Sequence, residues 1–490
     1  MEKTNKKFYV TTSILYASAP PHIGHALEFI QADVLARSQR AAGKDVFFLT
    51  GADEHGVKIA RAAEEAKKTT KKFVDENTEK IKKLIKILNI SNDGFIRTTD
   101  KKRHWPGAQK LWTKLAEAGD IYKKRYRGLY CVGHEAFVTD RYLINGVCAI
   151  HKTKPEILEE ENYFFRLSKY SKKIELFIKS GKLKVLPISR KNEILSLLKE
   201  GLEDISFSRL AKSLSWGIPV PNDSNHTMYV WCDALSNYIT ALGYGEETAK
   251  FKKYWPADVH VIGKDILRFH AAIWPGMLLS AKLPLPKTIF VHGFVTSGGE
   301  KMSKTVGNVV DPFEVVEKYG VDALRYYLLR EIPSGGDGDF TYEKFKERYS
   351  ADLAKGIGNL TARVLTLAQK GKISAKGGPA SGGKPLKNKA FASEISKVKK
   401  DSARSISEFK FNEALEKIWR LVALGDKYID VQKPWALQND SKKFKEIIGH
   451  LLFLLSGISG LIIPFMPETA DKIAKHIAKS KSTVLFPQLK

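Results

Sequence analysis

Near the N-terminus the spacing of apolar residues changes once, at a pair of prolines. Residues 8–17 are mainly β-branched and aromatic, as in a buried strand, and Ala19-Pro20-Pro21 ends the run. After the prolines, apolar residues recur at the spacing of one helix face, at Ile23, Leu27, Ile30 and Val34. The pattern therefore predicts a strand, a tight turn, and a helix that begins at residues 22–25 and runs to about residue 42.

Strand-like and helix-like segments continue to alternate along the chain. Apolar runs at about 45–50, 259–263 and 288–296 each precede a polar or glycine-containing loop, and residues 229–245 carry a helical apolar face. From about residue 351 the pattern is almost wholly helical. These features indicate an α/β fold with a Rossmann-type parallel sheet, followed by an α-helical bundle domain.

A chain of 490 residues is too long for a single core, so we expect several domains. Residues 118–225 interrupt the α/β pattern and are predicted to form a connective insertion. The expected divisions are the first half of the Rossmann domain at 1–117, the insertion at 118–225, the second half of the Rossmann domain at 226–322, a linking stem at 323–351 and the helical domain at 352–490.

One apolar stretch, residues 447–466, is long enough to cross a bilayer and contains no Lys, Arg, Asp or Glu. Glycine, serine and histidine residues interrupt it, and Pro464 breaks it near its end. We interpret it as a buried helix of the bundle and expect no membrane association.

The composition indicates a reducing compartment and a polyanionic partner. Three cysteines exclude a disulfide scaffold, and the polar Met1–Lys7 segment is too short for a secretory or transit sequence, so we expect a cytoplasmic protein. The net charge is +27, and residues 352–490 hold 25 Lys and Arg against 12 Asp and Glu. RNA is the simplest partner for such a basic domain; general solubility is the alternative explanation.

Candidate chemistry begins at the predicted helix start, where His22 and His25 are three residues apart. A helix N-terminus attracts anions through its free backbone N–H groups and its dipole, and both rings can face that opening. Gly24 leaves room for a flat ring against the backbone. The arrangement suits a nucleotide whose α-phosphate is attacked; the alternative is that both histidines only cap the helix or lie on the surface.

A second candidate lies far along the chain, where Lys301 and Lys304 flank Met302-Ser303 in a glycine-containing loop. Two ammonium groups on a mobile loop can neutralise a pyrophosphate whose charge develops during a reaction. In a chain this basic, the alternative is a solvated lysine pair.

Other polar residues follow predicted strands, where an open parallel sheet binds its ligands. Asp53 could hold a substrate ammonium, or could cap the next helix. Lys264 and Asp265 could reach a phosphate and a ribose hydroxyl. Nearby helical faces carry aromatic side chains that could form either core or a pocket for a flexible thioether, at Trp231, Tyr238, Phe269, His270 and Trp274.

Two further groups lie outside these segments. Within the insertion, two CxxH pairs separated by thirteen residues suit one tetrahedral Zn²⁺ ion, although they could also be unrelated; they are Cys131 with His134 and Cys148 with His151. In the helical domain, Asn359 and Arg363 share a helix face, and Trp435 follows a proline in a later loop. Such groups could hydrogen-bond and stack unpaired bases.

Taken together, HIGH at 22–25 and KMSK at 301–304 resemble the signatures of class I aminoacyl-tRNA synthetases. Across nearly the whole chain, the order of motifs is similar to that of the methionyl-tRNA synthetase family. These motifs are GADEHG at 51–56, YVWCDAL at 229–235, GKDILRFHAAIWP at 263–275, GNLTAR at 358–363 and KPW at 433–435.

The resemblance implies a methionine–tRNA ligase that activates L-methionine with ATP to methionyl-adenylate, transfers methionine to tRNA(Met), and releases AMP and pyrophosphate. ATP would be a substrate, with Mg²⁺ and one Zn²⁺ as metals. No protein nucleophile is implied, so catalysis would consist of positioning and charge stabilisation.

The resemblance also implies a set of site residues. The methionine pocket would comprise Ile14, Tyr16, Asp53, Trp231, Ala234, Leu235, Tyr238, Ile266, Phe269, His270 and Trp274, with Asp53 on the ammonium. The ATP site would comprise His22, Gly24, His25, Lys264, Asp265, Lys301 and Lys304, of which His22, His25, Lys301 and Lys304 would be catalytic. Zinc would be bound by Cys131, His134, Cys148 and His151, and the CAU anticodon would be read by Asn359, Arg363 and Trp435.

Three features depart from the family pattern. His134 stands where the zinc knuckle usually has cysteine, and Leu235 replaces a frequent proline. The sequence ends at Lys490, without the appended C-terminal domain of longer members, and we therefore expect a monomer.

Two other functions fit part of the sequence. A class I synthetase for leucine, isoleucine or valine would typically carry a larger editing insertion than residues 118–225. A non-catalytic tRNA-binding relative would be expected to have lost signature residues, yet both histidines and both lysines are present.

Overall fold

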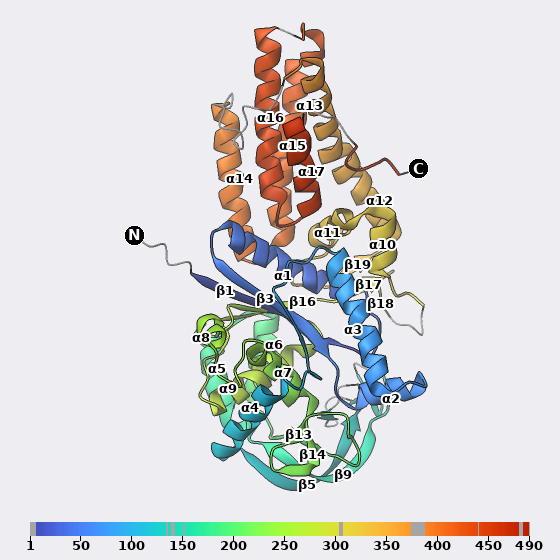
Figure 1. Ribbon diagram of the computed structural model, residues 1–490, viewed down its shortest axis with the longest axis vertical. Helices are drawn as coiled ribbons and strands as arrows, with labels where there is room; N and C mark the ends of the chain where they lie inside the picture. The colour runs from blue at the N-terminus through green and yellow to red at the C-terminus, as the bar shows by residue number, and fades with distance from the viewer. Residues whose placement is uncertain are drawn as a thin grey trace. The chain divides into compact units, whose positions relative to one another are not determined.

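The computed structural model describes residues 6–133, 136–138, 143–149, 152–302, 307–373, 388–439, 441–479 and 484–489. The chain forms two compact units, each of which combines segments that are far apart in the sequence (Figure 1). The first unit contains residues 1–21, 43–85 and 91–292. The second contains residues 22–42, 86–90 and 293–490.

A seven-stranded sheet lies at the centre of the first unit. Its order is β10-β16-β15-β1-β3-β2, with β4 also beside β3, and all of its pairs are parallel. The strands span Lys7–Thr12 (β1), Leu15–Tyr16 (β2), Asp45–Asp53 (β3), Gly94–Arg97 (β4), Lys184–Leu186 (β10), Val259–Gly263 (β15) and Thr288–His292 (β16). The central strands are almost wholly buried, as expected for continuous apolar runs in a parallel sheet. The α/β prediction is confirmed.

The first unit also contains eight α-helices within the described residues, one of which was predicted from its apolar face. α7 matches the apolar face predicted at 229–245, and the segment after β15 contains a short 3₁₀ turn η3 (Lys264–Ile266) and a π-helical stretch η4 (Phe269–Ile273). The α-helices are Val57–Glu65 (α2), Thr70–Ile87 (α3), Trp105–Glu117 (α4), Ser171–Lys179 (α5), Ile188–Glu200 (α6), Val230–Thr240 (α7), Ala249–Tyr254 (α8) and Trp274–Ser280 (α9).

Residues 118–225 build small antiparallel sheets and also supply β10 to the parallel sheet. One sheet has the order β11-β9-β5-β6, a second has the order β12-β14-β13, and β7 pairs with β8. The strands are Ile121–Cys131 (β5), Ala136–Val138 (β6), Leu143–Ile144 (β7), Val147–Cys148 (β8), Glu156–Phe165 (β9), Ile205–Ser206 (β11), Ser208–Leu210 (β12), Pro219–Val220 (β13) and Asp223–Met228 (β14); the 3₁₀ turn η2 is Leu167–Tyr170. The domain boundaries expected from the sequence stay a prediction.

The single strand predicted at 288–296 is wrong, because the run forms two strands. β16 ends at His292, whereas β17 (Val295–Ser297) pairs with β18 (Glu300–Lys301) and β19 (Gly338–Phe340) in the second unit. An added Cβ at Gly293 would come within 2.2 Å of the Gly336 backbone. Only glycine allows this close approach, and the apolar run is divided there.

The second unit is mainly helical, and helices α13–α17 pack into a bundle (Figure 1). Its helices are Ile23–Ala41 (α1), Pro312–Tyr319 (α10), Val321–Arg330 (α11), Tyr342–Arg348 (α12), Asn359–Lys370 (α13), Lys389–Ser407 (α14), Phe411–Gln432 (α15), Lys442–Ile462 (α16) and Pro467–Lys479 (α17), with a π-helical stretch Tyr349–Gly358 (η5) and a 3₁₀ turn Pro434–Ala436 (η6). Within the described ranges, α16 is the one helix that is long and apolar enough to cross a membrane. It packs against α13, α14, α15 and α17, as expected for a core helix of the bundle.

A buried arginine joins α1 to the bundle within the second unit. Arg325, on α11, donates to the Asp33 carboxylate of α1 at 2.7 Å, and both side chains have no exposed surface. The same guanidinium donates to the backbone oxygens of Leu88 (3.0 Å), Pro464 (3.0 Å) and Phe465 (2.7 Å). The ion pair therefore connects α1 with the 86–90 segment and with the turn between α16 and α17.

Replacing Asp33 with alanine should destabilise the second unit by about 3–5 kcal/mol, because the Arg325 charge stays buried without its counter-ion. Asp471→Ala is a matched control, because Asp471 pairs with Lys475 at an exposed position and its loss should cost less than about 1 kcal/mol. Denaturant unfolding of both variants measures the two effects. Equal losses in the two variants would contradict the role of the buried pair.

Candidate functional site

Asp53 ends strand β3 at the carboxyl edge of the parallel sheet, opposite Tyr16 of β2. Its side chain is buried and accepts the backbone N–H of His55 at 3.4 Å. Helix α2 begins with Gly56 as its N-cap and has no side-chain cap. The helix-cap alternative for Asp53 is therefore wrong, and a buried carboxylate lies at the edge where parallel sheets bind ligands.

Aromatic side chains from separate elements form one cluster in the first unit. Trp231 of α7 stacks on Phe269 of η4, with ring centroids 3.7 Å apart and planes within 10°. Tyr16 meets Trp231 edge-on at 6.1 Å, and His270 meets it edge-on at 6.2 Å. The structure thus brings together residues that the sequence places up to 254 positions apart, through β2, α7 and η4.

His270 is held in a single neutral form. Its Nδ1 lies 3.0 Å from the Ile266 backbone oxygen, which can only accept, so Nδ1 carries the hydrogen. Its Nε2 then accepts the Tyr238 hydroxyl hydrogen at 2.7 Å. Burial lowers the pKa of His270 to about 4, against a smaller opposing effect of the Ile266 bond. The cluster is therefore uncharged at neutral pH.

The remaining residues of the expected methionine pocket belong to the same cluster. Trp274 begins α9, and its ring lies 5.9 Å from Tyr238. Ala234 and Leu235 are buried on α7. Ile14 and Ile266 are partly buried and pack against the large hydrophobic cluster that contains Trp231, Tyr238 and Trp274.

Lys264 and Asp265 line a cavity of about 820 Å³ together with Phe269. A cavity of this size is typical of small-molecule sites. Arg209 also lines it; its side chain is buried, and its guanidinium lies 4.5 Å from the centre of the Tyr130 ring. The sequence analysis missed Arg209 because the residue lies in the insertion, away from every recognised motif.

In the second unit, His22 and His25 cap the first turn of α1. Gly24 N–H donates to His22 Nδ1 at 3.1 Å, and His22 N–H donates to His25 Nδ1 at 3.1 Å. The rings stack with centroids 3.9 Å apart. Capping and ligand binding are compatible, because both Nδ1 atoms accept and the neutral rings then carry their hydrogens on Nε2. Gly24 leaves room for the His22 ring in this position, since a Cβ added at residue 24 would lie 3.0 Å from the ring.

The lysine loop and the zinc candidates are only partly described. Lys301 lies in β18, opposite Thr296, and Lys304 lies outside the described residues. Cys131 and Cys148 are buried in one small cluster with Val138, and neither forms a disulfide. His134 and His151 lie outside the described residues. Among the residues with described placement, no group of three His, Cys, Asp or Glu is arranged to hold a metal.

The candidate anticodon residues lie on the helical bundle. Trp435 in η6 is 57% exposed, which excludes a role as a core residue. Asn359 is exposed at the first position of α13. Arg363 of α13 pairs with Asp426 (3.3 Å) and Asp430 (2.7 Å) of α15, so its guanidinium is held in place at the bundle surface.

Asp233 is a second residue that the sequence analysis missed. Its carboxylate is buried between two histidines, at 2.6 Å from His55 Nδ1 and 2.6 Å from His104 Nε2. His104 Nδ1 lies 2.8 Å from the Thr240 hydroxyl. Burial raises the pKa of Asp233, but the two histidines outweigh it and hold the pKa below its usual value. The carboxylate fastens His55, in the short segment between β3 and α2, to α7, which carries Trp231.

Two family models match the chain. One is described as tRNA synthetases class I (M) and matches residues 8–149 and 142–365. The other is described as the anticodon-binding domain of tRNA ligase and matches residues 388–490.

Similar relatives and a similar solved structure are named methionine–tRNA ligase or methionyl-tRNA synthetase. The methionine–tRNA ligase of Clostridium perfringens is 47% identical over 98% of this chain and 74% of its own length. The methionine–tRNA ligase of Brucella suis is 42% identical over 97% of this chain and 92% of its own length. A Mycobacterium tuberculosis methionyl-tRNA synthetase in complex with methionyl-adenylate has a TM-score of 0.89 and 38% identity, over 99% of both chains. With these matches across nearly its whole length, the chain belongs to the methionine–tRNA ligase family of class I tRNA synthetases.

Proposed function

We propose that this chain binds methionine in the aromatic cluster next to Asp53. The observation that carries the assignment is the uncharged surface formed by Trp231, Phe269, His270 and Tyr238, with a buried carboxylate at the adjoining strand end. Aromatic rings make favourable contacts with a thioether sulfur. The Asp53 carboxylate would pair with the methionine ammonium.

In the first step, a carboxylate oxygen of methionine attacks the α-phosphorus of ATP, and the bond to the β-phosphate oxygen breaks. The Nε2–H groups of His22 and His25 and the ammonium groups of Lys301 and Lys304 stabilise the charge that develops on the phosphates. Lys264 binds phosphate and Asp265 binds the ribose, while Mg²⁺ enters with ATP. The products are methionyl-adenylate and pyrophosphate.

In the second step, a hydroxyl of the terminal adenosine of tRNA(Met) attacks the methionyl carbonyl, and AMP leaves. The anticodon would bind at Trp435, with Asn359 and Arg363. The exposure of Trp435 and the fixed guanidinium of Arg363 support this surface. A cytoplasmic location and a monomeric state stay predictions.

We also propose one structural Zn²⁺ ion in the insertion, held by Cys131, His134, Cys148 and His151. The two thiols support it, because they are buried in one small cluster, whose apolar members among the described residues are Val138, Leu129 and Leu143. Tetrahedral zinc accepts two Cys and two His ligands, and it stabilises a segment that has little core of its own.

Lys301→Ala should slow adenylate formation by roughly 10²–10³-fold, because the lysine meets charge that develops only in the transition state. Methionine binding should change little. Lys318→Ala, at an exposed position on α10, is the matched control. Single-turnover kinetics with methionine and ATP measures the effect, and an unchanged rate for Lys301→Ala would exclude the role.

Metal analysis of protein purified without chelator should give one zinc per chain. Cys148→Ser should lower that ratio, whereas Cys232→Ser should keep it, because Cys232 lies on α7 outside the insertion. A ratio near zero in active wild-type protein would show that the site does not bind zinc.

Trp435→Ala should lower the kcat/KM for tRNA by about ten- to a hundredfold, since base–aromatic stacking is worth about 1–3 kcal/mol. Trp435→Phe keeps an aromatic face and should retain most of the activity. Methionine-dependent pyrophosphate exchange, which needs no tRNA, should stay nearly constant in both variants. A parallel loss of exchange and aminoacylation would argue against an anticodon role.

His270 should make stability depend on pH. Its folded-state pKa is below its unfolded value, so the unfolded chain binds a proton that the folded chain excludes. As the pH falls from about 6.5 to about 4, wild type should therefore lose about 1.4 kcal/mol per pH unit more than His270→Gln. Unfolding curves at several pH values test this, and equal slopes would contradict it.

A further inference from the structure

A second cavity in the first unit, of about 550 Å³, is lined by groups that the mechanism above does not use. These groups come from the segment between β3 and α2, α3, β4 with the loop after it, α4 and the segment near residue 216. The chemically distinctive ones are His55, Lys71, Arg97, Lys101, Trp105 and Trp216.

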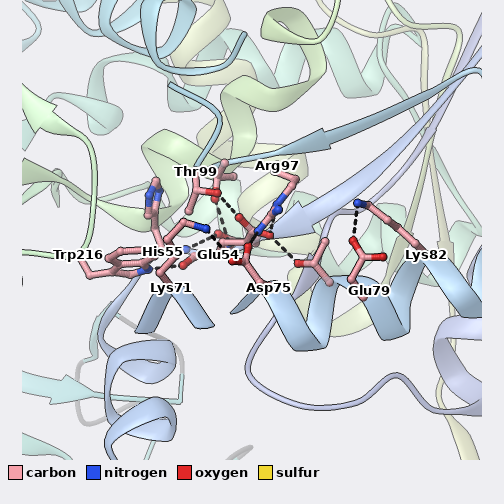
Figure 2. Close-up of polar contacts among 12 residues, drawn as sticks. Glu54, His55, Lys71, Asp75, Glu79, Lys82, Arg97, Thr99 and Trp216 are labelled. Atoms are coloured by element: carbon pink, nitrogen blue, oxygen red, sulfur yellow. Dashed lines mark hydrogen bonds and ion pairs between the residues drawn. The ribbon is translucent and has the colours of Figure 1, made fainter. Parts of the chain in front are cut away.

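Aromatic rings form one wall of this cavity. The indole N–H of Trp216 donates to the Glu54 backbone oxygen at 2.5 Å, and that of Trp105 donates to the Thr98 backbone oxygen at 3.0 Å. The His55 ring lies between them, with centroids 5.9 Å from Trp216 and 6.1 Å from Trp105. Figure 2 shows Trp216 beside His55 at one end of the polar cluster. The polar atoms of both indoles are thus satisfied by the protein, and their faces can stack a flat ligand.

Cations lie around the same cavity. Arg97 bridges Glu54, at 2.7 Å, and Asp75, and Lys71 pairs with Asp75 at 2.6 Å (Figure 2). Burial raises the pKa of Asp75, but the Lys71 and Arg97 bonds outweigh it and keep the carboxyl ionised. Lys101 is exposed, with its ammonium 4.9 Å from the Trp105 ring centre. Lys71 and Lys101 can therefore meet phosphates that approach from solvent.

A hydrogen bond connects the wall of this cavity to the helix of the proposed methionine pocket. His55 lines the cavity, and its Nδ1 bonds to Asp233, two residues after Trp231 on α7. Asp53, at the end of β3, lies two residues before His55. A ligand in this cavity would lie close to methionine that has been activated in the pocket.

We propose that this cavity takes the single-stranded 3′ end of the tRNA, with a base against Trp216 and Trp105 and phosphates at Lys71 and Lys101. Aromatic faces interleaved with exposed cations are the groups by which proteins bind unpaired nucleotides. The volume is in the range of a small-ligand site and suits one nucleotide. The inference rests on the proposed function, because the ligand in this place must be the acceptor of the activated methionine.

The test measures single-turnover transfer of methionine from preformed methionyl-adenylate to tRNA(Met) at subsaturating tRNA, beside pyrophosphate exchange. The double variant Lys71→Ala/Lys101→Ala should lower the transfer rate constant about tenfold. The slope of the logarithm of this rate constant against the logarithm of the salt concentration should become shallower by about 0.7 for each lost phosphate contact. Lys82→Ala is the matched control, because Lys82 lies on the same helix and pairs with the exposed Glu79 outside the cavity (Figure 2).

A second comparison separates stacking from structural support. Trp216→Phe and Trp216→Leu both lose the hydrogen bond to Glu54, but only phenylalanine keeps an aromatic face. Transfer by Trp216→Phe should therefore be about tenfold faster than transfer by Trp216→Leu. Exchange should be unchanged in the lysine variants. Any one of three results would overturn the inference. The first is an equal transfer rate in the two Trp216 variants, and the second is a transfer rate of the double variant equal to that of Lys82→Ala. The third is a fall in exchange that parallels the fall in transfer. Absence of methionine-dependent exchange in wild type would instead overturn the proposed function on which it rests.

Discussion

A charge can be buried in a protein only when several partners replace its water, and this constraint positions the candidate chemistry in both units. In the first unit, Asp233 lies between His55 and His104 and fastens the segment that follows Asp53 to the helix that carries Trp231. In the second unit, Arg325 holds α1, whose first turn presents His22 and His25, through Asp33 and backbone oxygens of the bundle. Each side chain thus fixes an element that carries candidate site residues.

The aromatic cluster combines a fixed shape with the absence of charge. The Ile266 backbone oxygen fixes the hydrogen of His270 on Nδ1, and the Tyr238 hydroxyl then has one acceptor, so the two rings hold each other in place. Phe269 and His270 belong to a π-helical stretch, which is an uncommon geometry that recurs at functional sites. Such a rigid neutral surface favours a thioether over a charged side chain, since a charge would lose its water there without gaining a partner.

Sequence reasoning predicted the parts that depend on local pattern. The helix that begins after His22, the buried strand that begins at Asp45 and the face that carries Trp231 all follow from spacing within about twenty residues. Two strand bounds were wrong, because the run at 8–17 forms two strands, β1 and β2, and β3 continues past residue 50 to Asp53. Asp233 and Arg325 could not be found in this way, because their partners lie 129, 178 and 292 positions away. The division of the 288–296 run likewise depends on the approach of Gly336 to Gly293, which no local pattern encodes. The histidines of the CxxH pairs and Lys304 lie outside the described residues, so their roles still rest on the sequence.

We propose that the aromatic cluster of Trp231 and Phe269 beside Asp53 selects methionine for activation. Pyrophosphate exchange, measured separately with each amino acid and without tRNA, tests this claim directly. Exchange should depend on methionine and should be far slower with leucine, isoleucine and valine. Faster exchange with another amino acid, or no exchange with methionine in folded protein, would contradict it.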